Sequence, residues 1–206
     1  KDFLVLDAGE SEFRARFPSA RKVGRAFPVY WLGGSEFAFP RAASLEQDLA
    51  ARDFTLNALA LDSDGGLFCH PQALEDMRDR ILRPCSPCSL ADDPLRVFRA
   101  ARFLAQFPEL TPHPDLLAAM EDAARAGLLA NLSAERVGRE LLKALAGPQP
   151  SRFPALLART GCLDPWFAEL ARCRDVPAGP APAHDSDVFG HTLAVLDRLA
   201  GDPLRA

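Results

Sequence analysis

The first third of the chain carries the short apolar runs and turn residues that are typical of strands. Residues 3–6 (FLVL) predict a short buried strand. Gly33 and Gly34 separate two apolar runs and predict a tight hairpin, and a second hairpin is predicted further along. The arms of the two hairpins are residues 28–32 with 36–39, and residues 58–61 with 67–69. We therefore expect a small sheet with flanking helices up to about residue 80.

From about residue 74 onward, capping residues and breakers delimit longer segments without strand signals. Asp93-Pro94 is a helix start, Ser133 is an N-cap, and Gly127, Gly147 and Gly161 are stops. The predicted helices span residues 95–107, 114–126, 133–147, 151–160 and 187–199. We expect residues 90–175 to be helical with no sheet, so the predicted fold class is α+β.

Composition narrows the class of protein. The chain has 206 residues, a quarter of them charged, which fits one large or two modest globular domains. Its net charge of −4 gives no overall case for nucleic-acid binding. Lysine occurs only three times, so arginine carries nearly all positive charge. No apolar run has the length of a membrane span, and five cysteines without an export signal predict a reducing cytoplasm.

Two groups of charged residues are candidates for chemistry. Asp2 precedes the first strand and Glu36 opens a hairpin arm, and carboxylates at adjacent strand ends suit Mg²⁺. Arg96, Arg99 and Arg102 share one face of a predicted helix, where they form either a phosphate-binding surface or a solvated face. Spacing alone favours the solvated face.

Two longer strings carry a family resemblance. Residues 51–60 (ARDFTLNALA) resemble RRDFTINALA, and residues 92–103 (DDPLRVFRAARF) resemble EDPLRVLRAARF. Both strings belong to the class II tRNA nucleotidyltransferases (CCA-adding enzymes) and the bacterial poly(A) polymerases. Shorter matches keep the chain order at residues 23–30, 36–41, 133–137 and 140–141, and residues 184–196 resemble the start of an HD-type tail domain.

The resemblance implies a metal site. The family motif is Asp-x-Asp followed by an apolar strand, so Asp2 is taken as the second aspartate and Lys1 as the middle residue. The first aspartate would then precede this chain. A rival alignment makes Asp2 the first aspartate but leaves Leu4 where a ligand is needed. Glu36 falls on the third carboxylate, so Asp2 and Glu36 are the implied catalytic and Mg²⁺-binding residues.

The resemblance also implies nucleotide-binding residues. Arg52, Arg99 and Arg102 fall on family positions that contact the incoming nucleotide. Asp53 and Asn57 fall on a motif associated with sugar recognition. Asp93 and Arg96 fall on the pair that reads the base edge. Glu135, Arg136 and Glu140 form either an ion-paired helix surface or the floor of the nucleotide pocket. A carboxylate accepts from an exocyclic amine while a guanidinium donates to ring acceptors. We expect Asp93 and Arg96 to face one cleft together with Asp2 and Glu36.

Some features depart from the family pattern. The N-terminal Gly-Gly and Arg-Asp string is absent, and Ala51, His70 and Ala73 replace usual family residues. Either parts of a longer protein lie outside this chain, or the chain is a divergent member with impaired catalysis. Cys69, His70, Cys85 and Cys88 could supply four zinc ligands, but a zinc site is the disfavoured interpretation. Trp31 and Trp166 are expected in the core.

The sequence therefore predicts a template-independent nucleotidyltransferase. It would add CMP or AMP from CTP or ATP to an RNA 3′ end, most readily that of tRNA, with no membrane partner. The alternatives are a poly(A) polymerase, a catalytically degenerate RNA- or nucleotide-binding module, and, least favoured, a phosphohydrolase built on the tail domain. The predicted parts are an N-terminally incomplete head (1–80), a helical nucleotide- and RNA-binding neck (81–147), a helical body (148–176), and a linker with the start of an HD-type tail (177–206).

Overall fold

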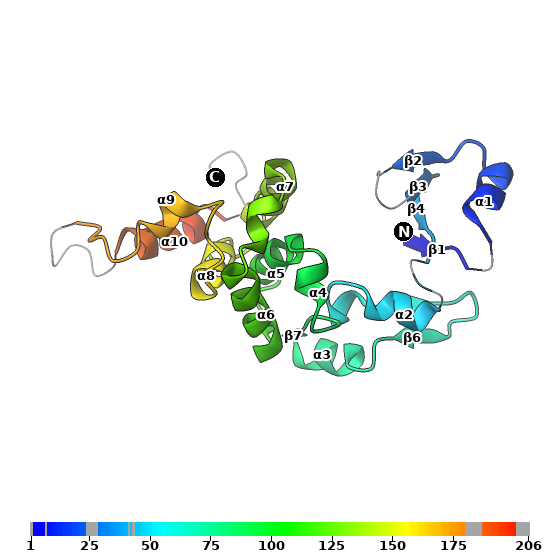
Figure 1. Ribbon diagram of the computed structural model, residues 1–206, viewed down its shortest axis with the longest axis horizontal. Helices are drawn as coiled ribbons and strands as arrows, with labels where there is room; N and C mark the ends of the chain where they lie inside the picture. The colour runs from blue at the N-terminus through cyan, green and yellow to red at the C-terminus, as the bar shows by residue number, and fades with distance from the viewer. Residues whose placement is uncertain are drawn as a thin grey trace. The chain divides into compact units, whose positions relative to one another are not determined.

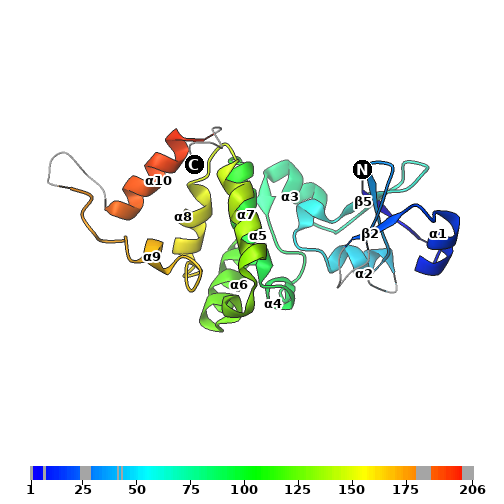
Figure 2. The same cartoon turned by 90° about the horizontal axis from the view of Figure 1, so that it is seen from above.

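The chain divides into two compact units. A computed structural model describes residues 2–6, 8–23, 29–40, 42, 44–179 and 187–200. Contacts separate residues 1–50 from residues 51–206, and each unit is described by itself (Figures 1 and 2). Parts of the matched strings, namely Lys1, residues 24–28, Arg41 and residues 180–186, lie outside the described residues. Strands and helices both occur, so the α+β fold class is confirmed.

The first unit is a four-stranded sheet covered by a short helix. Its strand order is β1-β4-β3-β2, with β1 parallel to β4 and the other pairs antiparallel. The strands are β1 (Asp2–Leu4), β2 (Arg21–Val23), β3 (Val29–Leu32) and β4 (Ser35–Ala38). The predicted hairpin is confirmed, because Gly33 and Gly34 turn the chain with φ of 57° and 82°. Helix α2 (Leu45–Ala50) ends the unit.

Aromatic packing fixes which face of this sheet is inside. Helix α1 (Glu10–Arg16) buries Phe13, whose ring lies 5.5 Å from that of Tyr30 and 5.4 Å from that of Phe37. Tyr30 and Phe37 are paired across β3 and β4, so they point to the same face. Helix α1 therefore covers the Tyr30 face and leaves the opposite face of the sheet uncovered by it.

The second unit begins with short elements. The second predicted hairpin is confirmed as β5 (Leu59–Leu61) and β6 (Leu67–Cys69). It is preceded by the 3₁₀ turn η1 (Thr55–Asn57) and followed by α3 (Ala73–Asp79), β7 (Ile81–Leu82) and α4 (Ser89–Asp92). Contacts divide the chain after residue 50, so the β5–β6 hairpin and α3, which packs on η1, belong to the second unit. The four-part functional division stays a prediction.

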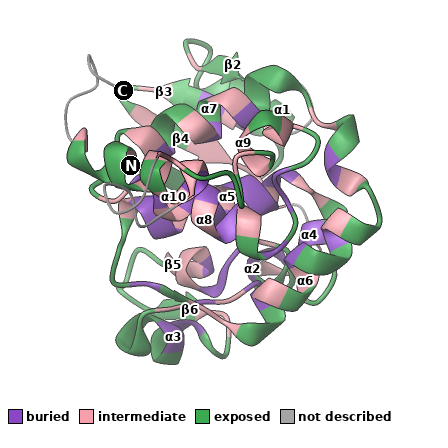
Figure 3. Cartoon of the chain, turned by 90° about the vertical axis from the view of Figure 1, so that its left-hand side faces the viewer, coloured by how far each residue is buried: buried purple, intermediate pink, exposed green. Residues whose placement is uncertain are grey.

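Helices make up the rest of the second unit. They are α5 (Leu95–Gln106), α6 (Pro114–Arg125), η2 (Leu128–Asn131), α7 (Ala134–Leu145), α8 (Arg152–Arg159), α9 (Ala168–Ala171) and α10 (Val188–Arg198). Ser133 caps α7 as predicted, with its hydroxyl accepting from the Arg136 N–H. Helix α5 packs against both α7 and α8 and supplies much of the buried core, seen in purple in Figure 3.

The expectation of no sheet within residues 90–175 is wrong. Strand β8 (Thr111–Pro112) lies between α5 and α6 and pairs in parallel with β7. The Thr111 N–H donates to the Arg80 carbonyl and the His113 N–H to the Leu82 carbonyl, each at 2.9 Å. An extended connection between two helices needs partners for its backbone groups, and β7 supplies them.

Among the helices that the structure describes, none combines the length and the apolar character of a membrane span.

Candidate active site

Asp2 and Glu36 are direct neighbours in the sheet. Strand β1 pairs with β4 in a register that makes the Cα atoms of Asp2 and Glu36 partners. Because paired residues of neighbouring strands point to the same face, both carboxylates stand on the face opposite α1. Both residues are exposed. The predicted adjacency is confirmed, while the catalytic role stays a prediction.

This carboxylate pair fits a hard divalent cation in its donor chemistry. Mg²⁺ takes one or two carboxylates from the protein and keeps its other positions for water and phosphate oxygens. Two exposed carboxylates on one face match that need. Across the described ranges, no group of three or more histidine, cysteine, aspartate or glutamate residues is placed to hold a metal.

Asp53 is the centre of a hydrogen-bond network in the second unit. Its side chain is only 9% exposed, and one oxygen accepts from the Phe54 N–H at 2.9 Å and from the Asn57 amide at 3.2 Å. The other oxygen accepts from Arg99 Nε at 2.9 Å and from Arg99 Nη2. Arg52 donates to the Asn57 carbonyl at 2.8 Å. The structure thus brings four predicted site residues together around η1, with Arg99 on α5 tied to the turn by a nearly buried carboxylate.

The two residues predicted to read the base edge, Asp93 and Arg96, lie at the start of α5 as expected. Asp93 lies directly before the first turn, and its two carboxylate oxygens accept from Arg136 Nη2 at 3.2 and 3.1 Å. Arg96 donates to the Ser89 carbonyl at 3.0 Å, to the Ser89 hydroxyl at 2.8 Å and to the Ala51 carbonyl at 2.8 Å. A guanidinium has five N–H donors, so these bonds fix Arg96 and leave two donors for a base. Whether this pair shares a cleft with Asp2 and Glu36 stays a prediction.

Arg102 lies deeper than the other arginines. Its Nε donates to Glu140 at 2.5 Å and its Nη1 to the Gln106 side chain at 2.5 Å, with the Arg102 and Glu140 side chains 11% and 7% exposed. Glu135 instead pairs with Arg139 at 2.8 Å on the exposed side of α7. Of the alternatives for α7, an ion-paired surface therefore describes Glu135, and Glu140 is part of the α5–α7 interface. The predicted contact of Arg102 with a triphosphate would compete with Glu140.

Sequence reasoning misplaced Trp31 and missed Ser89. The Trp31 side chain is not in the core, because the residue is 47% exposed. Strand alternation carries the signal: Tyr30 is buried against α1, so its neighbour points to the opposite face. Trp166 is partly buried, and its indole N–H donates to the Leu129 carbonyl at 2.8 Å. Ser89 is buried beneath Arg96, and no sequence motif marks it.

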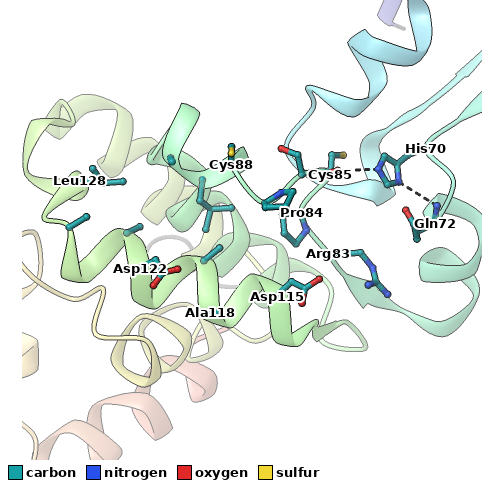
Figure 4. A pocket seen from close by; sticks show the side chains of 17 residues that line it. His70, Gln72, Arg83, Pro84, Cys85, Cys88, Asp115, Ala118, Asp122 and Leu128 are labelled. Atoms are coloured by element: carbon teal, nitrogen blue, oxygen red, sulfur yellow. Dashed lines mark hydrogen bonds between the residues drawn. The ribbon is translucent and has the colours of Figure 1, made fainter.

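A cavity of about 810 Å³ lies between α6 and the loop that precedes α4 (Figure 4). The close-up shows Arg83, Cys85 and Cys88 on the loop side and Asp115 and Asp122 on α6. Burial is the main cause that raises the pKa of the Cys85 thiol to about 12. The cysteines of this region are unpaired thiols rather than a disulfide.

Alkylation should distinguish Cys88 from Cys85 by their rates of reaction. A thiol with a pKa of about 12 holds about one thiolate in ten thousand at pH 8, and only the thiolate reacts. We expect iodoacetamide at pH 8 to label exposed Cys88 and to spare buried Cys85. Peptide mass spectrometry after a timed reaction measures this, with labelling in urea as the control. Equal labelling of both cysteines in the folded protein would contradict the burial described here.

Comparisons with known proteins found similar sequences and structures. Residues 109–173 match the family model described as the probable RNA and SrmB-binding site of polymerase A. A multifunctional CCA protein of Pasteurella multocida is 40% identical over 202 residues, which cover 96% of this chain and 46% of that protein. The counterpart in Stenotrophomonas maltophilia is 38% identical, with 97% of this chain and 54% of that protein covered.

Solved structures agree with these relatives. The Bacillus stearothermophilus CCA-adding enzyme in complex with CTP superposes with a TM-score of 0.70 and 32% identity over 79% of this chain and 44% of that one. The fold of this chain is thus similar to that of a CCA-adding enzyme. The chain is similar in sequence and fold to the family of CCA-adding enzymes and bacterial poly(A) polymerases. It spans about half the length of the curated relatives it matches.

Proposed function

We propose that the protein containing this chain is an RNA nucleotidyltransferase that adds CMP and AMP from CTP and ATP to the 3′ end of tRNA. The observation that carries this proposal is the register of Asp2 with Glu36, which sets two exposed carboxylates side by side on the face of the sheet opposite α1. The relatives at 40% and 38% identity are named multifunctional CCA proteins, which supports the choice of RNA end and nucleotides.

In the proposed reaction the RNA 3′ hydroxyl attacks the α-phosphate of the triphosphate. A P–O bond to the RNA forms, the bond to pyrophosphate breaks, and the hydroxyl proton passes to solvent. Asp2 and Glu36 would hold Mg²⁺. When bound there, the ion supplies positive charge against the triphosphate and the attacking oxygen. The two carboxylates then position the reacting ends, because in-register strands fix their separation.

The second unit is proposed to select and orient the incoming nucleotide. Asp93 presents a carboxylate that accepts from an exocyclic amine, and Arg96 presents the two donors that its own contacts leave. Asp53 and Asn57 would accept and donate to the ribose, with Arg99 holding Asp53 in place. The five unpaired cysteines fit the cytoplasmic location that we propose for the enzyme.

Replacing Asp93 by alanine should relax base choice more than it slows transfer. A good base contact contributes about 1–3 kcal/mol of discrimination, so the preference for CTP and ATP over UTP and GTP should fall about tenfold. Relative incorporation of the four triphosphates measures it. Asp92→Ala is the matched control, since Asp92 is the neighbouring exposed carboxylate. Unchanged preference with uniformly lower activity would make Asp93 a structural partner of Arg136.

The experiment that tests the proposed function uses full-length protein, tRNA lacking its 3′ end, and triphosphates labelled at the α-phosphate. We expect label to enter the RNA and pyrophosphate to appear in equal amount. A chelator should stop the reaction, and added Mg²⁺ should restore it. Binding of RNA without label transfer under these conditions would show that the protein is a binding module and would contradict the proposed activity.

A further inference from the structure

Four exposed residues form one row across the sheet of the first unit. Strand pairing matches Arg21 with Trp31, Trp31 with Glu36, and Glu36 with Asp2. Residues paired across neighbouring strands share a face, so all four stand on the face that α1 leaves uncovered. The row therefore reads, in order across the sheet, a guanidinium, an indole and two carboxylates.

Trp31 is the aromatic residue of this row. The residue is 47% exposed, and within the described residues its ring makes no aromatic contact and its N–H no hydrogen bond. The aromatic cluster of this unit lies on the other face, around Phe13 and Tyr30. A large exposed aromatic flanked by charged residues is the usual composition of a surface that stacks bases.

We propose that Trp31 is the stacking platform for the last base of the RNA acceptor and that Arg21 contacts the 5′-phosphate of that nucleotide. This inference rests on the proposed function and names the RNA subsite of that reaction. Neighbouring strands lie about 4.8 Å apart, so Trp31 is one strand from Glu36 and two strands from Asp2. A terminal nucleotide whose 3′ hydroxyl reaches the carboxylates thus has its base over Trp31.

The row offers one group to each of three parts of a terminal nucleotide. The 5′-phosphate, the base and the 3′ hydroxyl would face Arg21, Trp31 and the carboxylate pair in turn. The incoming nucleotide has its own proposed reading residues in the second unit, at Asp93 and Arg96, which leaves the platform to the acceptor strand. Stacking accepts any base, so one platform would serve an RNA that ends in C or in A.

Steady-state kinetics of the full-length enzyme test this assignment. Trp31→Ala should raise the KM for tRNA about tenfold, equally for RNAs ending in C and in A, while the KM for CTP changes by less than about twofold. Trp31→Phe should keep most of the RNA affinity, because the phenyl ring still stacks. Arg21→Ala should raise the KM for RNA and lessen its dependence on salt. Phe68→Ala is the matched control, an exposed aromatic on strand β6.

A binding measurement separates this inference from the proposed function. Fluorescence titration with an RNA that lacks its terminal 3′ hydroxyl requires no transfer, and it should show quenching that Trp31→Phe removes. Loss of RNA affinity in Trp31→Ala supports the platform even if the parent transfers no nucleotide. Unchanged RNA affinity in Trp31→Ala, or a KM increase for CTP alone, would overturn it. The thermal midpoint of each variant should match the parent, since an exposed side chain contributes little to the core.

Discussion

Replacing Glu36 by glutamine should reduce nucleotide transfer by about a thousandfold or more. The change keeps the size of the side chain and removes its charge, so the carboxylate pair with Asp2 is lost. A bound metal supplies several kcal/mol of transition-state charge stabilisation, and each 1.36 kcal/mol corresponds to a tenfold change in rate. Asp2→Asn should have a comparable effect. Single-turnover transfer of labelled CMP to tRNA measures both.

Two controls make this result specific. Glu12→Gln removes another exposed carboxylate from the same unit and should leave the rate within about twofold of the parent. The Kd for CTP should change far less in Glu36→Gln than the rate does, because the proposed nucleotide contacts lie on other residues. A Glu36→Gln enzyme with near-parental rates would rule out the carboxylate pair as the metal site.

Replacing Glu140 by alanine should destabilise the second unit by about 3–5 kcal/mol. The Arg102 guanidinium would remain between α5 and α7 without its carboxylate partner, and an uncompensated buried charge is expensive. Glu135→Ala is the matched control on the same helix: its exposed pair with Arg139 should contribute only about 0.3–0.5 kcal/mol. Urea unfolding of the full-length protein, followed by circular dichroism, measures the difference.

The same variants decide the role of Arg102. If Arg102 serves the helix interface, Arg102→Ala should lower stability as Glu140→Ala does, with the KM for every triphosphate nearly unchanged at a temperature where the protein is folded. If it binds the triphosphate, the KM for all four should rise together. A stability loss below about 1 kcal/mol in both variants would contradict the buried pair.

Local chemistry made parts of the fold predictable. The hairpin at Gly33-Gly34 follows from two residues that adopt positive φ without strain, and the helix at residue 134 follows from its Ser133 cap. Helix α1 was not predicted, because its seven residues bury only Phe13 and show no apolar stripe. Strand β8 was not predicted either, since two residues pair only after α5 and α6 have placed them beside β7.

Sequence motifs identified candidate site residues, but they did not give the pairings that these residues make. Family strings identified Asp53, Arg99 and Arg102, and helical spacing correctly placed the two arginines on α5. Spacing does not say which carboxylate each arginine meets, because Arg99 and Asp53 are 46 positions apart and Arg102 and Glu140 are 38 apart. Such pairs depend on how η1 and α7 pack against α5, which is decided by the tertiary fold.

Trp31 shows how a face assignment changes a functional interpretation. Its apolar character favoured a core position, and Tyr30 beside it does occupy the core. Alternation along β3 then sends Trp31 to the side of Asp2 and Glu36. Counting the alternation from Asp2 and Glu36, rather than from hydrophobicity, would have placed Trp31 on the exposed face.

Stepwise extension of tRNA is the most direct measurement of the central claim. Full-length protein is incubated with a tRNA that ends before its terminal three nucleotides, and products are resolved at single-nucleotide length. We expect CTP alone to add two nucleotides, ATP alone to add none, and both together to add three. A long tail with ATP alone, or no extension with any triphosphate, would contradict CCA addition by this protein.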